Sequence, residues 1–175
     1  MSIQLKGSDD SVYSNDIVAP NIPTQGQIVG YQQGVWIPTP SLGSITTFET
    51  SWVRIGNQVT VSANLRGFTD TTSNSVIALT GIPYARNFLF TVGAIRTAYL
   101  NFGEGSYVQV TLNSGDALRV GKSTPSLGGT SALVGEYVNY ISFISAQQSS
   151  TQLVFTITYI TDDTTWTPIN GATVL

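Results

Sequence analysis

Apolar and polar residues alternate with a period of two along much of this chain. The alternation is clearest over 57–66, where one face carries Val59, Val61, Ala63 and Leu65 and the other carries polar side chains. Because successive side chains of a strand point to opposite faces of a sheet, this pattern predicts a half-buried strand. The ranges 106–112 and 151–160 alternate in the same way. Further strands are expected at about 44–55, 75–80, 88–100, 117–122 and 137–145.

Turn-forming residues separate the predicted strands. Gly56-Asn57 lies between two apolar runs and predicts a tight hairpin with a positive φ at its first residue. Two more hairpin loops are expected at 113–116 and 147–150, and a Ser/Gly/Pro loop at 125–130. No range has the sustained spacing of apolar residues that predicts a helix. We therefore predict an all-β fold, an antiparallel two-sheet sandwich of jelly-roll-like type.

The first 34 residues differ from the rest, because prolines and glycines interrupt short apolar pairs there. This pattern predicts an extended N-terminal arm over 1–34 that orders against a partner, and a head domain over 35–175. No apolar run approaches the roughly 20 residues that span a bilayer, so no membrane insertion is expected. The N-terminus lacks the basic start and apolar block of a secretory signal. Synthesis in a cytoplasm without a cleaved signal is expected.

Composition excludes several kinds of chemistry. Charged residues make up 10% of the 175 residues, against roughly 25% in typical soluble domains, so Ser, Thr, Asn and Gln must build most of the surface. The net charge of −3 gives no basic field, and nucleic acid is not expected as a partner. With neither His nor Cys, the chain has no imidazole base, thiol or usual transition-metal ligand set. We expect no metal and no cofactor.

The acidic residues do not point to an enzyme. Glycoside hydrolysis usually needs two carboxylates at a fixed separation, and most acids here fall in the predicted arm or in turns. Glu49, Glu104 and Glu136 remain as conceivable acids. Asp162-Asp163 could ligate Ca²⁺, but a solvated turn is the favoured interpretation. Ser and Thr are abundant but have no customary base. No catalytic residue is therefore assigned.

Two sets of residues are candidates for binding. Alternation places Tyr107, Gln109 and Thr111 on an outward face, where an aromatic ring beside amide and hydroxyl groups suits a sugar, although ordinary surface aromatics would give the same pattern. Over 137–145 both faces of the predicted strand carry apolar groups. Such a strand needs a second cover, so we predict a contact with another subunit. The candidates for this contact are Tyr137, Val138, Tyr140 and Phe143.

Three motifs in order resemble a module of tailed-bacteriophage fibre proteins. They are Gly34-Val35-Trp36-Ile37-Pro38, then Ile55-Gly56-Asn57-Gln58-Val59 after an aromatic-rich strand, then Gly81-Ile82-Pro83-Tyr84. The resemblance covers about 50 residues, with Trp52 where the family commonly has Tyr and Ile82 in place of Leu. The remaining chain is compatible with the module but does not identify it.

The resemblance implies a virion appendage: a homotrimer with a β-sandwich head, fastened to other virion proteins by its N-terminal arm. Heads of this kind generally bind a host-surface receptor, often a glycan and sometimes a protein, without cleaving it. A purely structural capsid-decoration or tail/baseplate adaptor protein is the alternative. A polysaccharide-degrading tail enzyme is a third hypothesis. Whether the protein sits on capsid, tail or baseplate stays open.

Overall fold

A computed structural model describes residues 5–6, 12–13, 30–87, 91–101, 107–113, 116–124 and 134–175. Most of these residues lie in antiparallel strands, which confirms the predicted all-β class. Two short 3₁₀ helices, η2 and η3, are the other regular elements of this part of the chain. The elements are β1 (Leu5–Lys6), β2 (Val12–Tyr13), β3 (Tyr31–Val35), β4 (Thr39–Pro40), β5 (Ile45–Ile55), β6 (Gln58–Phe68), β7 (Ala78–Thr80), β8 (Thr91–Ala98), β9 (Tyr107–Asn113), β10 (Ala117–Thr124), β11 (Val134–Tyr137), η2 (Tyr140–Ser142), η3 (Ser145–Ser150), β12 (Gln152–Ile160) and β13 (Thr173–Val174).

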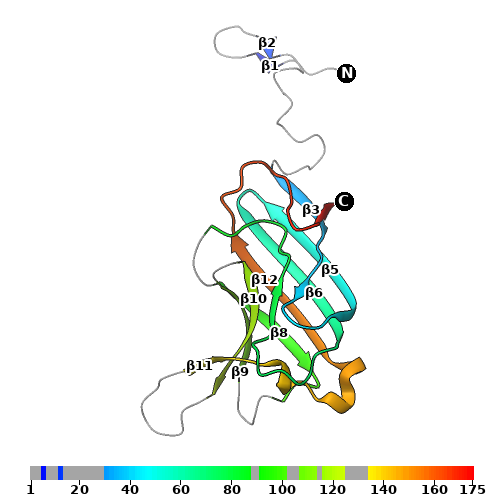
Figure 1. Cartoon of the computed structure of the whole chain (residues 1–175). Helices are drawn as coiled ribbons and strands as arrows, with labels where there is room; N and C mark the ends of the chain where they lie inside the picture. Colours follow the sequence, from blue (N-terminus) through cyan, green and yellow to red (C-terminus); the bar gives the residue numbers. More distant parts are fainter. Residues whose placement is uncertain are drawn as a thin grey trace.

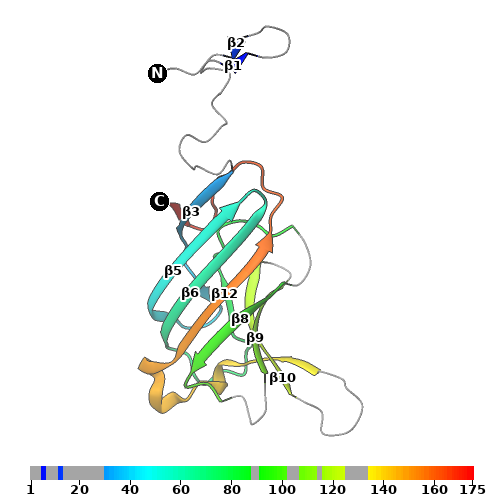
Figure 2. The same ribbon diagram turned by 180° about the vertical axis from the view of Figure 1, so that it is seen from behind.

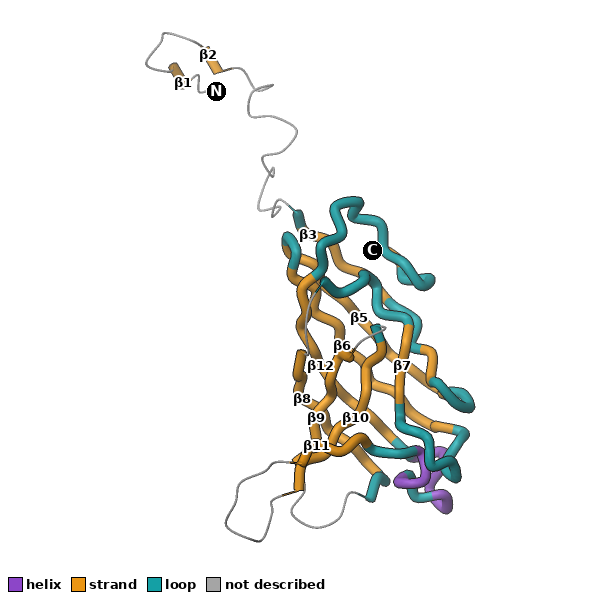
Figure 3. Tube along the Cα trace, turned by 60° about the vertical axis from the view of Figure 1, so that its left-hand side comes forward, coloured by secondary structure: helices purple, strands orange, loops and turns teal. Residues whose placement is uncertain are grey.

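One sheet of eleven strands forms the head. Its order is β13-β3-β5-β6-β12-β8-β9-β10-β7-β4, and β11 pairs with 121–124 of β10, along the same edge as β7. The sheet curls along its length, so that the half from β13 to β8 lies across from the half that contains β9 and β10 (Figures 1 and 2). The fold belongs to the sandwich class, and its two layers are continuous through β8. Figure 3 shows this curvature from the side.

The turn of the sheet is made within β8. Residues 94–98 of this strand pair with β12, and residues 91–93 pair with β9. Gly93 therefore lies where the partner changes. A Cβ built on Gly93 would sit 2.3 Å from the carbonyl oxygen of Thr156 and 2.7 Å from Cβ of Ile157. The backbones approach so closely at this corner that only glycine fits.

The predicted alternation of inward and outward residues is confirmed on the central strands. On β6 the apolar residues face the core, and β12 buries Leu153, Phe155, Ile157 and Tyr159 in the same way. The opposite layer adds Val110, Leu112, Leu118 and Val120. Burial of these side chains from both layers is what holds the two halves of the sheet together.

The turns between the strands were predicted with mixed success. Gly56 has a φ of +59°, which confirms the hairpin between β5 and β6. Asn113 pairs with Ala117, which confirms a hairpin there, with Asp116 at a φ of +55°. The hairpin predicted at 147–150 is wrong, because η3 occupies that range before β12 begins. The loop predicted at 125–130 lies outside the described residues.

The strand predicted over 137–145 is also wrong. Strand β11 ends at Tyr137, and η2 then folds the chain across the end of the sheet. In this conformation Val138, Tyr140 and Phe143 all enter the core of their own chain, with exposed fractions of 2%, 0% and 3%. The ring of Phe143 stacks on that of Phe68, with 4.7 Å between centroids. These three residues are therefore not available to another subunit, whereas Tyr137 is 36% exposed.

The boundary predicted between arm and head falls inside a strand. Residues 31–34 of β3 pair with β5, and Gly34 and Val35 pair with β13. The head therefore begins at about Gly30, not at residue 35. Upstream, β1 and β2 pair with each other as a separate two-stranded sheet. The rest of the predicted arm lies outside the described residues.

Replacing Gly93 tests the corner of the sheet. We expect Gly93→Ala to lower the free energy of unfolding by about 3 kcal/mol or more, because the added methyl group meets backbone atoms that cannot move aside. Gly56→Ala is the matched control, since a Cβ there meets nothing within 4 Å and only the positive φ is strained. That strain costs about 1–2 kcal/mol. Urea unfolding of both variants gives the comparison, and equal losses would contradict this account of the corner.

Candidate functional site

A buried arginine ties the C-terminal loop to the sheet. Arg54, near the end of β5, is 2% exposed although the head is poor in charge. Its guanidinium lies between two aromatic rings, with Cζ 4.4 Å from the ring centroid of Tyr84 and 3.9 Å from that of Trp166. Its Nε donates to the carbonyl oxygen of Gly56 at 2.8 Å. Arginine suits this position because its planar, weakly hydrated group can stack and pair at once.

Asp163 supplies the compensating charge. Its Oδ2 accepts a hydrogen bond from Nη1 of Arg54 at 2.7 Å, and its backbone oxygen accepts one from Nη2. The Thr165 hydroxyl, the Arg54 guanidinium and the backbone N–H groups of Trp166 and Thr165 hold the pKa of Asp163 at about 2, below its ordinary 3.8. The predicted solvated turn is therefore wrong for Asp163, whose carboxylate is an ion-pair partner. A buried arginine without it would be an uncompensated charge.

Tyrosines and a glutamine extend this cluster into the core. The hydroxyl of Tyr84 donates to Oε1 of Gln32, and Nε2 of Gln32 donates to the carbonyl oxygen of Trp166 at 3.0 Å. The hydroxyl of Tyr159 donates to the carbonyl oxygen of Tyr84 at 3.0 Å. Burial raises the pKa of both tyrosines, so both stay neutral donors. The cluster thus fixes β3, β5, β12 and the 82–87 loop relative to the C-terminal loop.

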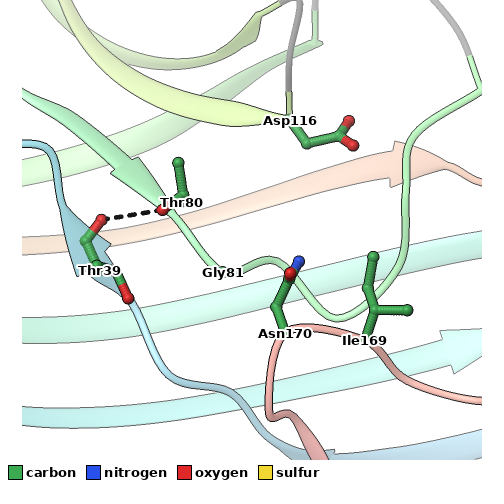
Figure 4. Close-up of a pocket in the computed structure, with 6 residues that line it drawn as sticks. All are labelled: Thr39, Thr80, Gly81, Asp116, Ile169 and Asn170. Carbon is green, nitrogen blue, oxygen red and sulfur yellow. Dashed lines mark hydrogen bonds between the residues drawn. The ribbon is translucent and has the colours of Figure 1, made fainter.

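The C-terminal loop that this cluster fixes forms one wall of a polar cleft of about 410 Å³. Figure 4 shows its lining, which comes from four separate parts of the chain. Strands β4 and β7 contribute one side, the turn before β10 another and the loop before β13 the third. The lining residues are Thr39, Thr80, Gly81, Asp116, Ile169 and Asn170.

Three polar side chains of this cleft are held in place by neighbours. The Thr80 hydroxyl donates to the carbonyl oxygen of Thr39 at 3.3 Å, and the Asn170 amide donates to that of Ile82 at 2.9 Å. Oδ1 of Asp116 accepts from the backbone N–H of Arg86 at 3.3 Å and lies 3.7 Å from its Nε. The cleft therefore presents hydroxyl, amide and carboxylate oxygens around Ile169. This set suits a ligand rich in hydroxyl groups.

A second polar surface covers the outer face of β5, β6 and β12. Hydroxyl pairs bridge β6 and β12, at 2.8 Å between Thr60 and Thr158 and 2.9 Å between Ser62 and Thr156. Asn64 donates to Glu49 at 3.0 Å and accepts from Gln152 at 2.7 Å. A shallow depression of about 300 Å³ lies over this face. It is flatter than the cleft and has no exposed aromatic side chain among its lining residues.

The receptor-binding candidates Tyr107, Gln109 and Thr111 share one strand but are not all open to solvent. All three lie on β9, and the side chain of Tyr107 lies outside the described residues. Gln109 is half-buried on the outer face. Thr111 is 7% exposed, and its hydroxyl donates to the carbonyl oxygen of Arg119 at 3.4 Å. The prediction that Thr111 is open to solvent is therefore wrong, because alternation gives the side of a sheet but not what covers it. Neither Gln109 nor Thr111 is among the described residues that line the cleft.

The cleft residues were not predicted as a group. Asp116 was assigned to a turn, which is correct, but nothing in the sequence brings it beside Asn170 or Thr39. The Asn170-Gly171 pair is typical of a tight turn, and both residues have a positive φ in the structure. Of the conceivable acids, Glu49 binds Asn64 and Glu136 pairs with Lys122 at 3.3 Å, while Glu104 lies outside the described residues.

Four large residues of the fibre-like motifs pack in the core. Trp36, Trp52, Ile82 and Tyr84 are at most 1% exposed. Gly34 lets β13 approach, since a Cβ there would lie 1.7 Å from the carbonyl oxygen of Thr173. These motif residues therefore contribute to packing.

Searches for related proteins gave no further guidance. Neither protein-family models, nor curated proteins, nor solved structures match this chain. Within the described ranges, no three Asp or Glu residues gather closely enough to hold a metal ion. No helix there has the length and apolar character needed to cross a membrane.

The ion pair between Arg54 and Asp163 predicts how stability depends on pH. The lowered pKa of Asp163 means that its contribution is complete above the ordinary value of 3.8 and is lost as the pH falls through about 2. We expect Asp163→Asn to be clearly less stable than the natural chain at pH 6, and the difference to shrink between pH 4 and 2. Urea unfolding across this range measures it. A difference that stays constant down to pH 2 would show that the carboxylate charge is not what stabilises the loop.

Proposed function

We propose that this chain is a bacteriophage virion appendage whose head binds a host-surface glycan without cleaving it. The observation that carries the proposal is the cleft, whose polar groups are held in place around one apolar side chain. Hydrogen-bonding groups that are already oriented bind hydroxyls at a smaller entropic cost than mobile ones. The resemblance of the three motifs to phage fibre modules supports the assignment to a virion.

The homotrimer and the attachment arm belong to the same proposal. Both come from the resemblance, with the first residues serving as the contact with other virion proteins. The partner predicted for Val138, Tyr140 and Phe143 is not part of it, since those side chains fill the core of their own chain. Localisation on the virion follows from the same resemblance.

Substitutions in the cleft test the binding function. We expect Thr80→Val and Asp116→Asn each to weaken binding of the purified protein to host cells about tenfold. Thr80→Val removes a hydroxyl group and Asp116→Asn removes the charge of a carboxylate, and both keep the shape of the side chain. Thr60→Val is the matched control, since it removes a hydroxyl from the outer face of β6. Titration of labelled protein on host cells gives the affinities. If the cleft variants bind like the natural protein, the cleft is not the receptor site; if the natural protein binds no host preparation, the function is wrong.

A purely structural virion protein is the second candidate, and one feature favours it. A row of large apolar side chains lies across the outer face next to the start of the head. Tyr31 pairs with Ile55, which lies in the same row as Gln58 and Ile160. The three apolar residues are 42%, 48% and 42% exposed. Exposed apolar rows of this kind are typical of protein contacts.

Two truncations separate the arm from the head. Deleting residues 1–29 should leave a folded head that no longer attaches to particles, because every strand of the large sheet is retained. Deleting 1–34 should in addition destabilise the head, because it removes most of β3 and the hydrogen bonds of Gln32 to Tyr84 and Trp166. Thermal unfolding and co-sedimentation with particles are the measurements. Attachment by the chain that lacks 1–29 would refute the role of the arm.

A further inference from the structure

One half-buried cation of the head has no hydrogen-bond or ion-pair partner among the described residues. Arg119 on β10 is half-buried, and its Nε is buried with no hydrogen-bond partner there. The other described cations of the head are accounted for, since Arg66 bonds to Asn64 and Arg96 is exposed to water. The rest form ion pairs, namely Arg54 with Asp163, Arg86 with Asp116 and Lys122 with Glu136. A half-buried charge without a counter-charge is unfavourable unless a ligand supplies one.

The surroundings of Arg119 are those of a recognition surface. Leu118 and Val120 point into the core, so Arg119 and Gly121 occupy the outer face of β10. Gly121 lies between Gln109 on β9 and Tyr137 on β11. The guanidinium carbon of Arg119 lies 5.1 Å from the ring centroid of Tyr137, which is 36% exposed. A cation, an aromatic ring and an amide therefore share one face of three adjacent strands.

The acidic residue nearest in sequence to this surface does not neutralise it. Glu136 precedes Tyr137 on β11, so its side chain points to the other face of the strand. It is already paired there with Lys122 at 3.3 Å. Within the described residues, Arg119 therefore has no counter-charge, on a chain whose net charge is −3.

We propose that Arg119, Tyr137 and Gln109 bind an acidic saccharide through its carboxylate. The guanidinium Nη groups form a fork that matches a carboxylate with two parallel hydrogen bonds. The exposed part of the Tyr137 ring offers an apolar surface to the sugar ring, and the Gln109 amide is suited to its hydroxyls. This ring and amide favour a sugar over an acidic peptide. The inference rests on the proposed glycan-binding function and gives the receptor a chemical class, a glycan that contains uronic acid.

The test compares charged and neutral forms of the same sugars. Trimers of galacturonic, glucuronic and mannuronic acid are titrated into the full chain by calorimetry, each beside its methyl ester, which keeps the hydroxyls and removes the charge. We expect at least one acid to bind ten or more times tighter than its ester. Arg119→Gln should abolish this preference, and Arg119→Lys should retain a part of it, because the charge remains but the fork is lost. Arg96→Gln, on the outer face of β8, is the matched control and should change nothing.

Several results would overturn the proposal. They are equal binding of acid and ester in all three pairs, an unchanged preference in Arg119→Gln, or binding of a tri-aspartate peptide as tight as that of the best trimer. The acid–ester comparison on the natural chain remains decisive even if Arg119→Gln does not fold, which thermal unfolding reveals. Binding to host cells distinguishes a failure of the proposed acidic specificity from a failure of the proposed glycan-binding function. If the natural chain binds host cells and Arg119→Gln binds them equally, only the acidic specificity is wrong; if the natural chain binds no host preparation, the glycan-binding function itself fails.

Discussion

The buried guanidinium of Arg54 is the interaction on which the shape of the head most depends. It is paired with Asp163 and stacked between Tyr84 and Trp166, so one side chain connects β5 to two loops. Desolvation of such a charge is costly and is offset only when its partners surround it completely. The arrangement therefore admits few alternatives. It holds the C-terminal loop in place, and that loop forms a wall of the cleft.

The curl of the sheet is the second constraint. At Gly93 the strand β8 passes from β12 to β9, and the missing side chain lets the backbones approach there. Because the sheet turns at this point, its two halves bury a common core and their loops meet at one end. Thr39, Asp116 and Asn170 lie far apart in the sequence and come together for that reason. The cleft therefore depends on the turn of the sheet at Gly93 as well as on the residues that line it.

The surface chemistry follows from the low charge. Neutral hydroxyl and amide groups cover the outer strands and pair with one another, as Thr60 does with Thr158. Most cations of the described head form ion pairs or hydrogen bonds, whereas half-buried Arg119 has no acidic partner among the described residues. Under the proposed function, the cleft and the surface around Arg119 distinguish glycans by charge as well as by shape. Both surfaces lie on strands or on loops held by hydrogen bonds, so the proposed binding requires little ordering of the protein.

The sequence by itself determined the class of fold and most of its strands. Alternation is a local property, and Val59, Val61 and Leu65 had to face a core whatever lay opposite. The sequence did not determine the path of 137–145. Apolar residues at successive positions are compatible with a strand covered on both faces, and equally with a turn such as η2 whose side chains enter the core. The sequence also did not predict the ion pair between Arg54 and Asp163 or the contact of Arg119 with Tyr137. Whether a charge is paired, buried or left open depends on contacts between segments distant in the chain, and only the tertiary structure supplies those.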